Sequence, residues 1–471
     1  MIDQRILKEL RGIVGKQHVL TAPEDLVAYS YDGTFAEHRP DIVVRPDSTE
    51  QVSKVMKVAS REAITVVPRG MASGLAAASV PIHGGMALDT CRMNRILEID
   101  EVNFAVTAEA GVITQTLADT VTKKGLFYPP DPSSIKQSTL GGNAACNAGG
   151  PRCLKYGVTS DYVRGMTVVL ADGRVLKTGG KAIKNVTGYN LTQLFVGSEG
   201  TLGVITELIL KLLPLPKVAR TAKAVFPKLA DASRCVNAIL AVGITPATIE
   251  LMDETTIATI EEAMHLSLPL DVEAILIIES DGMDEEAVVQ EIETIADICR
   301  KTGARDVDVA RNEKERTALW AARRAISPSL ARRAPNKLGE DISVPRSAIP
   351  QAVAAIKEIS RKHDIPIAIF GHAGDGNLHP NILFDKRDPV QMEKVKRAAS
   401  DIFGVALRLG GTLSGEHGVG SFKLPFLETD VGPIFVDVMT NIKKALDPKN
   451  ILNPGKVVPG TAPGSKELLD W

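Results

Sequence analysis

Short apolar runs alternate with amphipathic stretches over the first part of the chain. Residues 41–46 (DIVVRP) and 64–70 (ITVVPRG) predict strands, and residues 48–63 between them predict a helix. This β-α-β rhythm is typical of an α/β domain. Residues 1–30, which precede it, are expected to be helical.

Strand-like pieces dominate the next stretch. Several lie between residues 84 and 114, and residues 166–180 (MTVVLADGRVLKTGG) predict a hairpin around Asp172-Gly173, because Asp-Gly favours a tight turn between strands. The pattern changes at residues 212–220 (LLPLPKVAR), where Pro214 and Pro216 interrupt the chain. We expect a domain boundary there.

Beyond the prolines, apolar runs such as 245–253 (TPATIELMD), 273–282 (EAILIIESDG) and 365–372 (IPIAIFGH) predict strands. Helical patterns at 284–303 and 347–364 separate them. The alternation indicates an antiparallel or mixed sheet with helices on one face.

The expected division of the chain is 1–214, with an N-terminal helical segment, followed by 215–424 and 425–471. The tail at 460–471 is expected to be mobile.

Composition narrows the function classes. The 471 residues carry 55 Lys and Arg against 57 Asp and Glu, a formal charge of -2, which argues against wholesale nucleic-acid binding. Five cysteines are too few for a disulfide scaffold. Since the N-terminal stretch does not resemble a signal peptide and no apolar run reaches about 18 residues, we expect a cytoplasmic protein without a transmembrane segment, although peripheral docking at a membrane stays open.

Three tracts of small residues suggest a long ligand lying along backbone. The first is 66–81 (VVPRGMASGLAAASVP), the second 129–157 (PPDPSSIKQSTLGGNAACNAGGPRCLKYG) and the third 196–207 (VGSEGTLGVITE). None fits the GxGxxG or GxxxxGK[ST] pattern. Backbone N–H groups with almost no side chain around them can approach an anion closely, so we predict a dinucleotide-sized cofactor. Tight packing of turns is the alternative.

A histidine pair marks a second candidate site, in residues 367–384 (IAIFGHAGDGNLHPNILF). If Asp375-Gly376 forms a two-residue turn, His372 and His379 are directly opposed on one face and can share a cation. Asn381 points to the same face. A third ligand is available in residues 410–420 (GGTLSGEHGVG). The alternatives are a stacked, hydrogen-bonded histidine pair and a solvated turn.

These motifs resemble those of a known family. PRGMASGL, PPDPSS, STLGGNAACNAGG, KYG and VGSEGTLGVITE are similar to the FAD-binding domain of the vanillyl-alcohol oxidase/p-cresol methylhydroxylase superfamily. The match is to its D-lactate dehydrogenase and glycolate oxidase flavoprotein branch, and it runs from about residue 20 to DPKNILNPGKVVP. The resemblance implies an α+β or α/β fold, with a two-subdomain FAD-binding domain at 1–214 and a substrate (cap) domain at 215–424 whose largely antiparallel sheet is covered by helices. It also implies that the C-terminal segment at 425–471 returns to the FAD-binding domain.

The resemblance also implies FAD, with its pyrophosphate on the first tract. Because PRGMASG contains no His or Cys, we predict noncovalent FAD. The residues expected to bind it are Pro68, Arg69, Gly70, Met71, Ala72, Ser73, Gly74, Leu75, Pro130, Asp131, Pro132, Ser138, Thr139, Gly141, Gly142, Asn143, Asn147, Gly149, Gly200, Gly203, Ile205 and Asn453.

Carried over by position, the family's active-site residues fall on GHAGDGNLHPN, SGEHGVG and the helix LWAARRAISPSL. The resemblance implies a divalent metal (Zn, Mn or Fe) on His372, His379 and Glu416, with His417 as base and Asn381 as a substrate contact. It places Arg323 on the substrate carboxylate, with Ser327 on the same helix face and Arg324 as the rival. Lys337 could be a second carboxylate contact, but its spacing differs from relatives that bind diacids.

The implied activity is FAD- and metal-dependent oxidation of a D-2-hydroxy acid, with D-lactate going to pyruvate by hydride transfer to flavin N5. The electron acceptor would be a quinone or a partner such as electron-transferring flavoprotein or an iron–sulfur subunit. Glycolate oxidation is the first alternative. D-2-hydroxyglutarate dehydrogenase, a zinc hydrolase and a non-catalytic electron-relay flavoprotein are the others.

Overall fold

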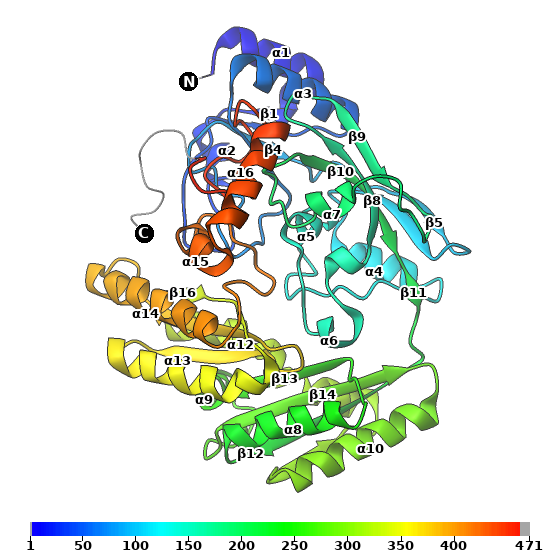
Figure 1. The fold of residues 1–471 in the computed structure, drawn as a ribbon, viewed down its shortest axis with the longest axis vertical. Helices are drawn as coiled ribbons and strands as arrows, with labels where there is room; N and C mark the ends of the chain where they lie inside the picture. Colours follow the sequence, from blue (N-terminus) through cyan, green and yellow to red (C-terminus); the bar gives the residue numbers. More distant parts are fainter. Residues whose placement is uncertain (1, 462–471) are drawn as a thin grey trace. The chain divides into compact units, whose positions relative to one another are not determined.

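The computed structural model describes residues 2–461 and divides the chain into two compact units (Figure 1). Over the described residues, unit 1 comprises residues 2–149, 158–215 and 416–461, and unit 2 comprises residues 150–157 and 216–415. The first boundary lies beside the expected Pro214. The return to unit 1 begins at Glu416 rather than at residue 425. Most of the tail expected to be mobile, from residue 462 on, lies outside the described residues.

Unit 1 begins with the predicted β-α-β arrangement. Strands β2 and β3 each pair in parallel with β4, and β1 adds antiparallel to β2. Helices α1 and α3 pack on this sheet through Leu10, Val52 and Met56, which are fully buried. The bounds are α1 Gln4–Val14, β1 Val19–Leu20, β2 Ile42–Val44, α3 Thr49–Glu62, β3 Val66–Arg69 and β4 Met86–Asp89. Residues 1–30 are thus only partly helical, since β1 and a short α2 (Pro23–Val27) follow α1.

A five-stranded antiparallel sheet forms the other half of unit 1, in the order β5-β6-β10-β8-β9. The predicted hairpin is confirmed: β8 and β9 pair across a turn in which Gly173 has φ +84°. The bounds are β5 Ile96–Asp100, β6 Ala105–Glu109, β8 Val163–Val169, β9 Val175–Gly179 and β10 Val204–Lys211. The remaining elements are α4 Thr114–Thr122, β7 Leu126–Phe127, α5 Leu140–Cys146, α7 Leu191–Phe195, β11 Leu213–Pro214, α15 Leu427–Val431 and α16 Pro433–Leu446.

Unit 2 is built on one antiparallel sheet, in the order β15-β12-β14-β13-β18-β19-β16, with β17 also paired to β19. The strands are β12 Val218–Phe226, β13 Thr248–Asp253, β14 Ala274–Gly282, β15 Asp306–Val309, β16 Asn336–Gly339, β17 Ile342–Ser343, β18 Ile367–His372 and β19 Asn377–Phe384. A short helix, α6 (Cys153–Tyr156), belongs to this unit. Lys155 and the Tyr156 hydroxyl hold it there by donating to the Asp281 carboxylate on β14, at 2.6 and 2.8 Å.

Helices cover both faces of the sheet in unit 2, so the expectation of a single covered face is wrong. Ile257 of α9 and Ile326 of α12 share a core with Ile277 of β14, whereas α10 brings Val288 against Gly282 on the opposite face. The physical reason is that EAILIIESDG is apolar at both parities, so both faces must be buried. The helices are α8 Leu229–Ala241, α9 Glu254–Met264, α10 Glu285–Lys301, α11 Glu313–Leu319, α12 Ala321–Arg333, α13 Ile349–His363 and α14 Pro389–Arg408.

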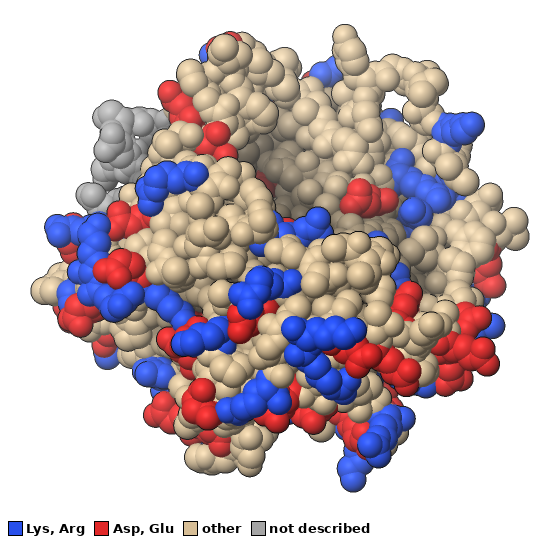
Figure 2. Space-filling model, turned by 60° about the horizontal axis from the view of Figure 1, so that its bottom comes forward, with Lys and Arg blue, Asp and Glu red and all other residues tan. Residues whose placement is uncertain are grey.

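The surface carries both signs of charge. On the face drawn in Figure 2, Lys and Arg side chains intermingle with Asp and Glu, in keeping with the near balance of charges in the sequence. Among the described residues, none of the helices combines the length and apolarity needed to cross a bilayer.

Candidate functional site

The three small-residue tracts meet within unit 1, to which the second tract contributes its residues 129–149. A Cβ added to Gly70 of the first tract would lie 2.2 Å from Oγ1 of Thr139 in the second. One added to Gly200 of the third tract, where φ is +73°, would lie 3.2 Å from the Pro68 ring of the first. The first approach leaves no room for a side chain, and the second combines a tight contact with a positive φ that favours glycine. The glycines therefore bring the tracts together.

Backbone hydrogen bonds fix the third tract to the second. Gly197 N donates to Ala144 O at 2.9 Å and Glu199 N donates to Ala145 O at 2.8 Å, so the tract turns along helix α5. Thr139 caps that helix by accepting from Gly142 N at 3.2 Å.

Part of the glycine pattern remains open to a ligand. Gly74 has nothing within 4 Å of an added Cβ, and Gly142 has only Thr139 Oγ1. Residues 70–75 are partly or fully exposed, and Ala72 has φ +52°. By contrast, Gly141 packs on Ala110 and Gly203 on Val168, at 2.6 and 2.4 Å from an added Cβ. The alternative reading, tight packing, therefore accounts for those two glycines.

Several of the expected cofactor residues already have partners inside unit 1. Asn143 donates to Thr114 Oγ1 at 2.8 Å, and Asn147 Oδ1 accepts from Ser160 N at 2.8 Å. Arg69 donates through Nη1 to Tyr29 O at 2.9 Å. The others lie in or beside the three tracts: Met71 and Ser73 are exposed or partly so, as are Leu75 and Asp131, while Pro130, Pro132, Ser138, Gly149 and Ile205 are buried.

Two side chains of the C-terminal segment bind backbone carbonyls of the first tract. Lys456 is buried and donates to the carbonyls of Ala77, Ala78 and Val80 at 2.6, 3.0 and 2.7 Å. Burial lowers the pKa of its ammonium group to about 8. Asn453 donates through Nδ2 to Ala78 O at 2.9 Å, and its Oδ1 is buried without a hydrogen-bond partner.

Glu199 holds the segment in which unit 1 resumes. Its two carboxylate oxygens accept from Val419 N and Gly420 N at 2.7 and 2.9 Å. Burial raises the pKa of this carboxyl to about 7, although both backbone hydrogen bonds oppose the shift. Glu416 and His417 lie at the start of the same segment.

In unit 2, neighbouring strands line up a polar row on one face of the sheet. Glu250 on β13 is the direct partner of His372 on β18, and His372 is the partner of Asn377 on β19. His379 lies two residues further along β19, opposite Phe370, and so on the same face. The expected register, with His372 directly opposite His379, is wrong.

The turn between β18 and β19 explains the difference. It comprises residues 373–376, and the N–H groups of both Asp375 and Gly376 point to His372 O, at 3.3 and 3.1 Å. The register differs from the expected one by two residues, which keeps both histidines on one face. As diagonal neighbours they still meet: their Nε2 atoms are 3.4 Å apart, and the rings are nearly perpendicular, at 84°.

Glu250 links the histidine pair to an arginine. Its Oε1 lies 2.5 Å from His372 Nδ1 and its Oε2 lies 2.5 Å from Arg323 Nε, and its side chain is fully buried. Burial would raise the pKa of Glu250, but the charges of His372 and Arg323 and their hydrogen bonds outweigh it and lower the pKa to about 2. Sequence reasoning missed Glu250, although a carboxylate in the middle of the strand pattern TPATIELMD was the available signal.

The two candidate arginines of α12 have different surroundings. Arg323 is largely buried beside Glu250, and its guanidinium carbon lies 5.0 Å from the Phe370 ring centroid. Arg324 is exposed and donates to Thr317 O on the preceding helix, α11. Ser327, also exposed, accepts from Lys337 Nζ at 2.9 Å. Burial lowers the pKa of Lys337.

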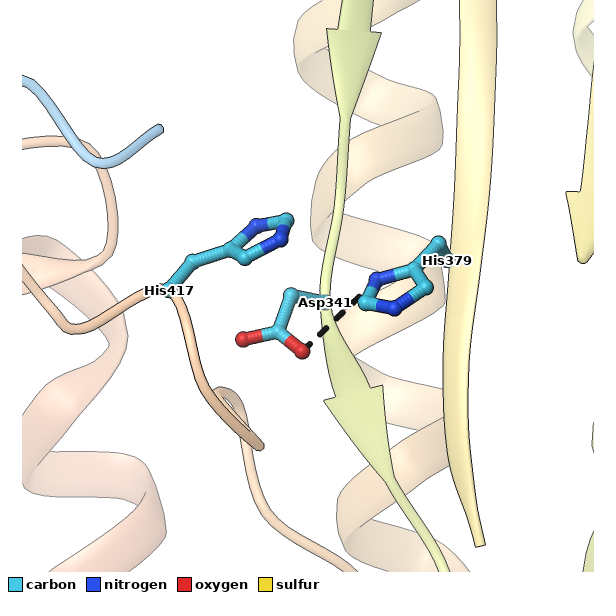
Figure 3. A group of neighbouring side chains, drawn as sticks. All are labelled: Asp341, His379 and His417. Atoms are coloured by element: carbon cyan, nitrogen blue, oxygen red, sulfur yellow. Dashed lines mark ion pairs between the residues drawn. The ribbon is translucent and has the colours of Figure 1, made fainter. Parts of the chain in front are cut away.

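Asp341 supports the other side of the histidine pair. Its Oδ1 lies 3.8 Å from His379 Nδ1 (Figure 3, which also labels His417) and accepts from Asn377 Nδ2 at 2.7 Å. Its Oδ2 accepts from the Ser414 hydroxyl at 2.8 Å. Asn381 is buried on β19, the strand of His379, and its amide donates to His379 O at 2.9 Å. Like Glu250, Asp341 was not singled out from the sequence.

Comparison with known proteins identifies the family. Residues 40–179 match the FAD binding domain and residues 215–457 match the C-terminal domain of FAD linked oxidases. The chain is 46% identical over 458 residues to the glycolate oxidase subunit GlcD of Bacillus subtilis, covering 97% of each. It is 37% identical to GlcD of Escherichia coli K12, covering 96% of this chain and 91% of that one. It is 35% identical to a D-lactate dehydrogenase of Anaerostipes hadrus, covering 97% and 98%.

Solved structures show the same fold. p-Cresol methylhydroxylase with bound substrate aligns with a TM-score of 0.82 at 19% identity, over 97% of each chain. 4-Ethylphenol oxidase from Gulosibacter chungangensis aligns with a TM-score of 0.80 at 22% identity, again over 97% of each. The α/β FAD-binding domain and the cap domain expected from the sequence are thereby confirmed. With two matched domains and these relatives, the chain belongs to the FAD-linked oxidase family and has the fold of the vanillyl-alcohol oxidase/p-cresol methylhydroxylase superfamily.

Proposed function

We propose that the chain oxidises a small D-2-hydroxy acid, using FAD and a divalent metal ion held by the histidine pair. The observation that carries the proposal is the 3.4 Å separation of the Nε2 atoms of His372 and His379, next to a buried arginine. An arginine can hold a carboxylate and a metal can hold a hydroxyl, which are the two polar groups of a 2-hydroxy acid.

The spacing of the two nitrogens fits a shared metal ion. Two ligands at zinc–nitrogen distances of about 2.0–2.1 Å, at a tetrahedral angle, lie about 3.3–3.4 Å apart. A hydrogen bond between the two rings would normally be shorter, at about 2.7–3.2 Å. Because Glu250 is ionised, His372 must donate from Nδ1 to it, which leaves the Nε2 lone pair for a metal.

Glu416 is proposed as the third ligand. Ser414 is bonded to Asp341, and a Cβ added to Gly415 would lie 2.2 Å from Asn377 Nδ2, so the chain runs against β19 up to that point. Because consecutive Cα atoms are about 3.8 Å apart, the next residue starts close to this strand. Two histidines and one carboxylate leave an open position for substrate, and this ligand type admits Zn, Mn or Fe.

The first tract is proposed to receive noncovalent FAD. Its open backbone at residues 70–75 and the unpartnered Oδ1 of Asn453 suit a ligand with an anionic bridge and hydrogen-bond donors. FAD, when bound, supplies the acceptor for a hydride from C2 of the substrate.

This chain's residues would then divide the work of oxidation. Arg323 binds and orients the substrate carboxylate. His417 would accept the proton of the 2-hydroxyl on its imidazole as a general base. A metal ion at the histidine pair, acting as a Lewis acid, would lower the pKa of that hydroxyl.

Glycolate is the other candidate substrate beside the D-lactate expected from the sequence. The names of the relatives favour glycolate. The relative at 46% identity is named a glycolate oxidase subunit, whereas the one named D-lactate dehydrogenase is 35% identical. The name "subunit" also supports a protein partner for the electrons. We propose electron-transferring flavoprotein or an iron–sulfur subunit as that partner.

An anaerobic visible spectrum tests the proposal. Purified protein is titrated with D-lactate, L-lactate or glycolate, before and after treatment with a chelator, and the metal content is measured in parallel. We expect a yellow protein whose flavin band is bleached by D-lactate or glycolate, not by L-lactate, and no longer after chelation. A colourless protein that binds zinc would support a hydrolase instead. A yellow one that no hydroxy acid bleaches would support an electron-relay role.

A further inference from the structure

We propose that Glu250 is the positioning residue that couples the metal half of the substrate site to its carboxylate half. One oxygen orients the imidazole of His372 and the other orients the guanidinium of Arg323. This inference rests on the proposed function, because it assigns both partners of Glu250 to substrate binding.

The sheet makes this double contact a feature of the fold. Glu250 and His372 are cross-strand partners on β13 and β18, and such side chains stand about 5 Å apart on one face. Arg323 approaches from α12, which packs on that face through Ala322, Ala325 and Ile326. A carboxylate at position 250 therefore reaches both groups without leaving its strand.

Only a carboxylate satisfies both partners. His372 donates from Nδ1 and Arg323 donates from Nε, so each oxygen of Glu250 must accept. A glutamine offers one accepting oxygen and one donating NH₂ group. With glutamine, either the arginine loses its acceptor, or His372 must accept on Nδ1 and carry its proton on Nε2, where a metal would bind.

A second contact holds the guanidinium of Arg323. The guanidinium lies over Phe370, and the Phe370 ring centroid is 5.5 Å from that of His379. Glu250, His372, His379, Phe370 and Arg323 thus form a closed ring of contacts. With Nε engaged by Glu250, the Nη1 and Nη2 groups are those left to grip a carboxylate end-on.

The test compares three variants of the full-length, FAD-loaded protein: Glu250→Gln, Glu250→Asp and the control Glu279→Gln. Glu279 is a buried carboxylate on the neighbouring strand β14 that also binds an arginine, Arg316, at 2.8 Å. Zinc affinity is measured by competition with a chromophoric chelator. Carboxylate affinity is measured separately on metal-free protein, from the flavin spectral shift caused by the 2-oxo acid product.

For Glu250→Gln we expect zinc affinity to fall about 10- to 100-fold, the range found for ligand-orienting partners, and the affinity for the 2-oxo acid to fall in parallel. Glu250→Asp keeps both acceptors and should recover part of each loss. Glu279→Gln should change neither affinity.

The inference is overturned if Glu250→Gln changes neither affinity, or only one of them, while the flavin spectrum and melting temperature show a folded protein. If that variant does not fold, Glu250→Asp decides alone, and wild-type values for both affinities overturn the inference. Failure of the proposed function gives a different result. In that case the wild-type protein itself binds no zinc, and no hydroxy acid bleaches its flavin.

Discussion

Adjacent arginines on α12 are distinguished by what their side chains touch. Arg323 contacts the buried Glu250, whereas Arg324 is exposed and donates a hydrogen bond to the backbone oxygen of Thr317. A sequence shows only that both are arginines on one helix. The contact with Glu250 distinguishes Arg323, the candidate for binding the substrate carboxylate, from Arg324, whose charge is solvated.

We expect Arg323→Lys to lower kcat/KM for the hydroxy acid about 30- to 150-fold. Lysine keeps the charge but loses the planar fork, and two charged hydrogen bonds correspond to about 2–3 kcal/mol. Arg324→Lys, the matched control, should stay within about twofold of wild type. Stopped-flow reduction of the flavin measures both. Comparable losses in the two variants would contradict the assignment of Arg323.

Glu199 should make the stability of unit 1 depend on pH. Its carboxyl has a pKa of about 7 in the folded chain, raised by burial from 4.5. The folded state therefore binds more protons between these values, so the free energy of unfolding falls as the pH rises from about 4.5 to 7. The contribution amounts to about 3 kcal/mol, at about 1.4 kcal/mol for each pH unit.

Urea unfolding, followed by flavin fluorescence at pH 5 and pH 8, measures this effect. The stability of wild type minus that of Glu199→Gln should be larger at pH 5 than at pH 8. Parallel pH profiles for the two proteins would show that Glu199 does not titrate in this range.

At the scale of elements, the strands of the β18–β19 hairpin follow from the sequence but their register does not. The assumed hairpin turn placed His372 and His379 on one face of the sheet, and an error of two residues in the register left both histidines on that face. The Asp375-Gly376 pair suggested a two-residue turn. The observed turn comprises residues 373–376, and its Gly376 lies against Val344, whose carbonyl oxygen would be 2.0 Å from an added Cβ. A contact with a distant residue cannot be seen in a dipeptide.

That contact makes Gly376 sensitive to substitution. We expect Gly376→Ala to cost at least about 3 kcal/mol, because it combines a positive φ of +89° with a backbone clash. Gly410→Ala is the matched control: φ there is +75° and nothing lies within 4 Å, so the cost should be the conformational one alone, about 1–2 kcal/mol. Chemical denaturation of both variants gives the comparison. Equal losses would argue against the clash with Val344.

At the scale of the whole molecule, the noncovalent state of FAD can be tested directly. The segment Pro68–Gly74 contains no His or Cys to form a bond to the flavin. After precipitation of the protein with acid, we expect all of the yellow colour in the supernatant. Colour that stays with the pellet would demonstrate a covalent attachment elsewhere in the chain.

The large-scale plan is readable from the sequence because it rests on periodicity. The β-α-β start and the strand-rich second half both appear in the structure. The insertion of Gly150–Gly157 into unit 2 does not follow from any pattern. It depends on Lys155 and Tyr156 meeting Asp281, more than a hundred residues away.

The dependence of the first tract on Lys456 has a consequence for biosynthesis. The chain leaves unit 1 at Leu215 and returns only at Glu416, and the ammonium group that holds Ala77, Ala78 and Val80 comes later still. At about 5–20 residues per second, a ribosome needs roughly 10–50 s to translate from Leu215 to Lys456. During that interval the residues of unit 1 up to Leu215 have been synthesised, but Lys456, which holds the first tract, has not. Ribosome-bound chains should therefore acquire flavin only after the last part of the message has been translated.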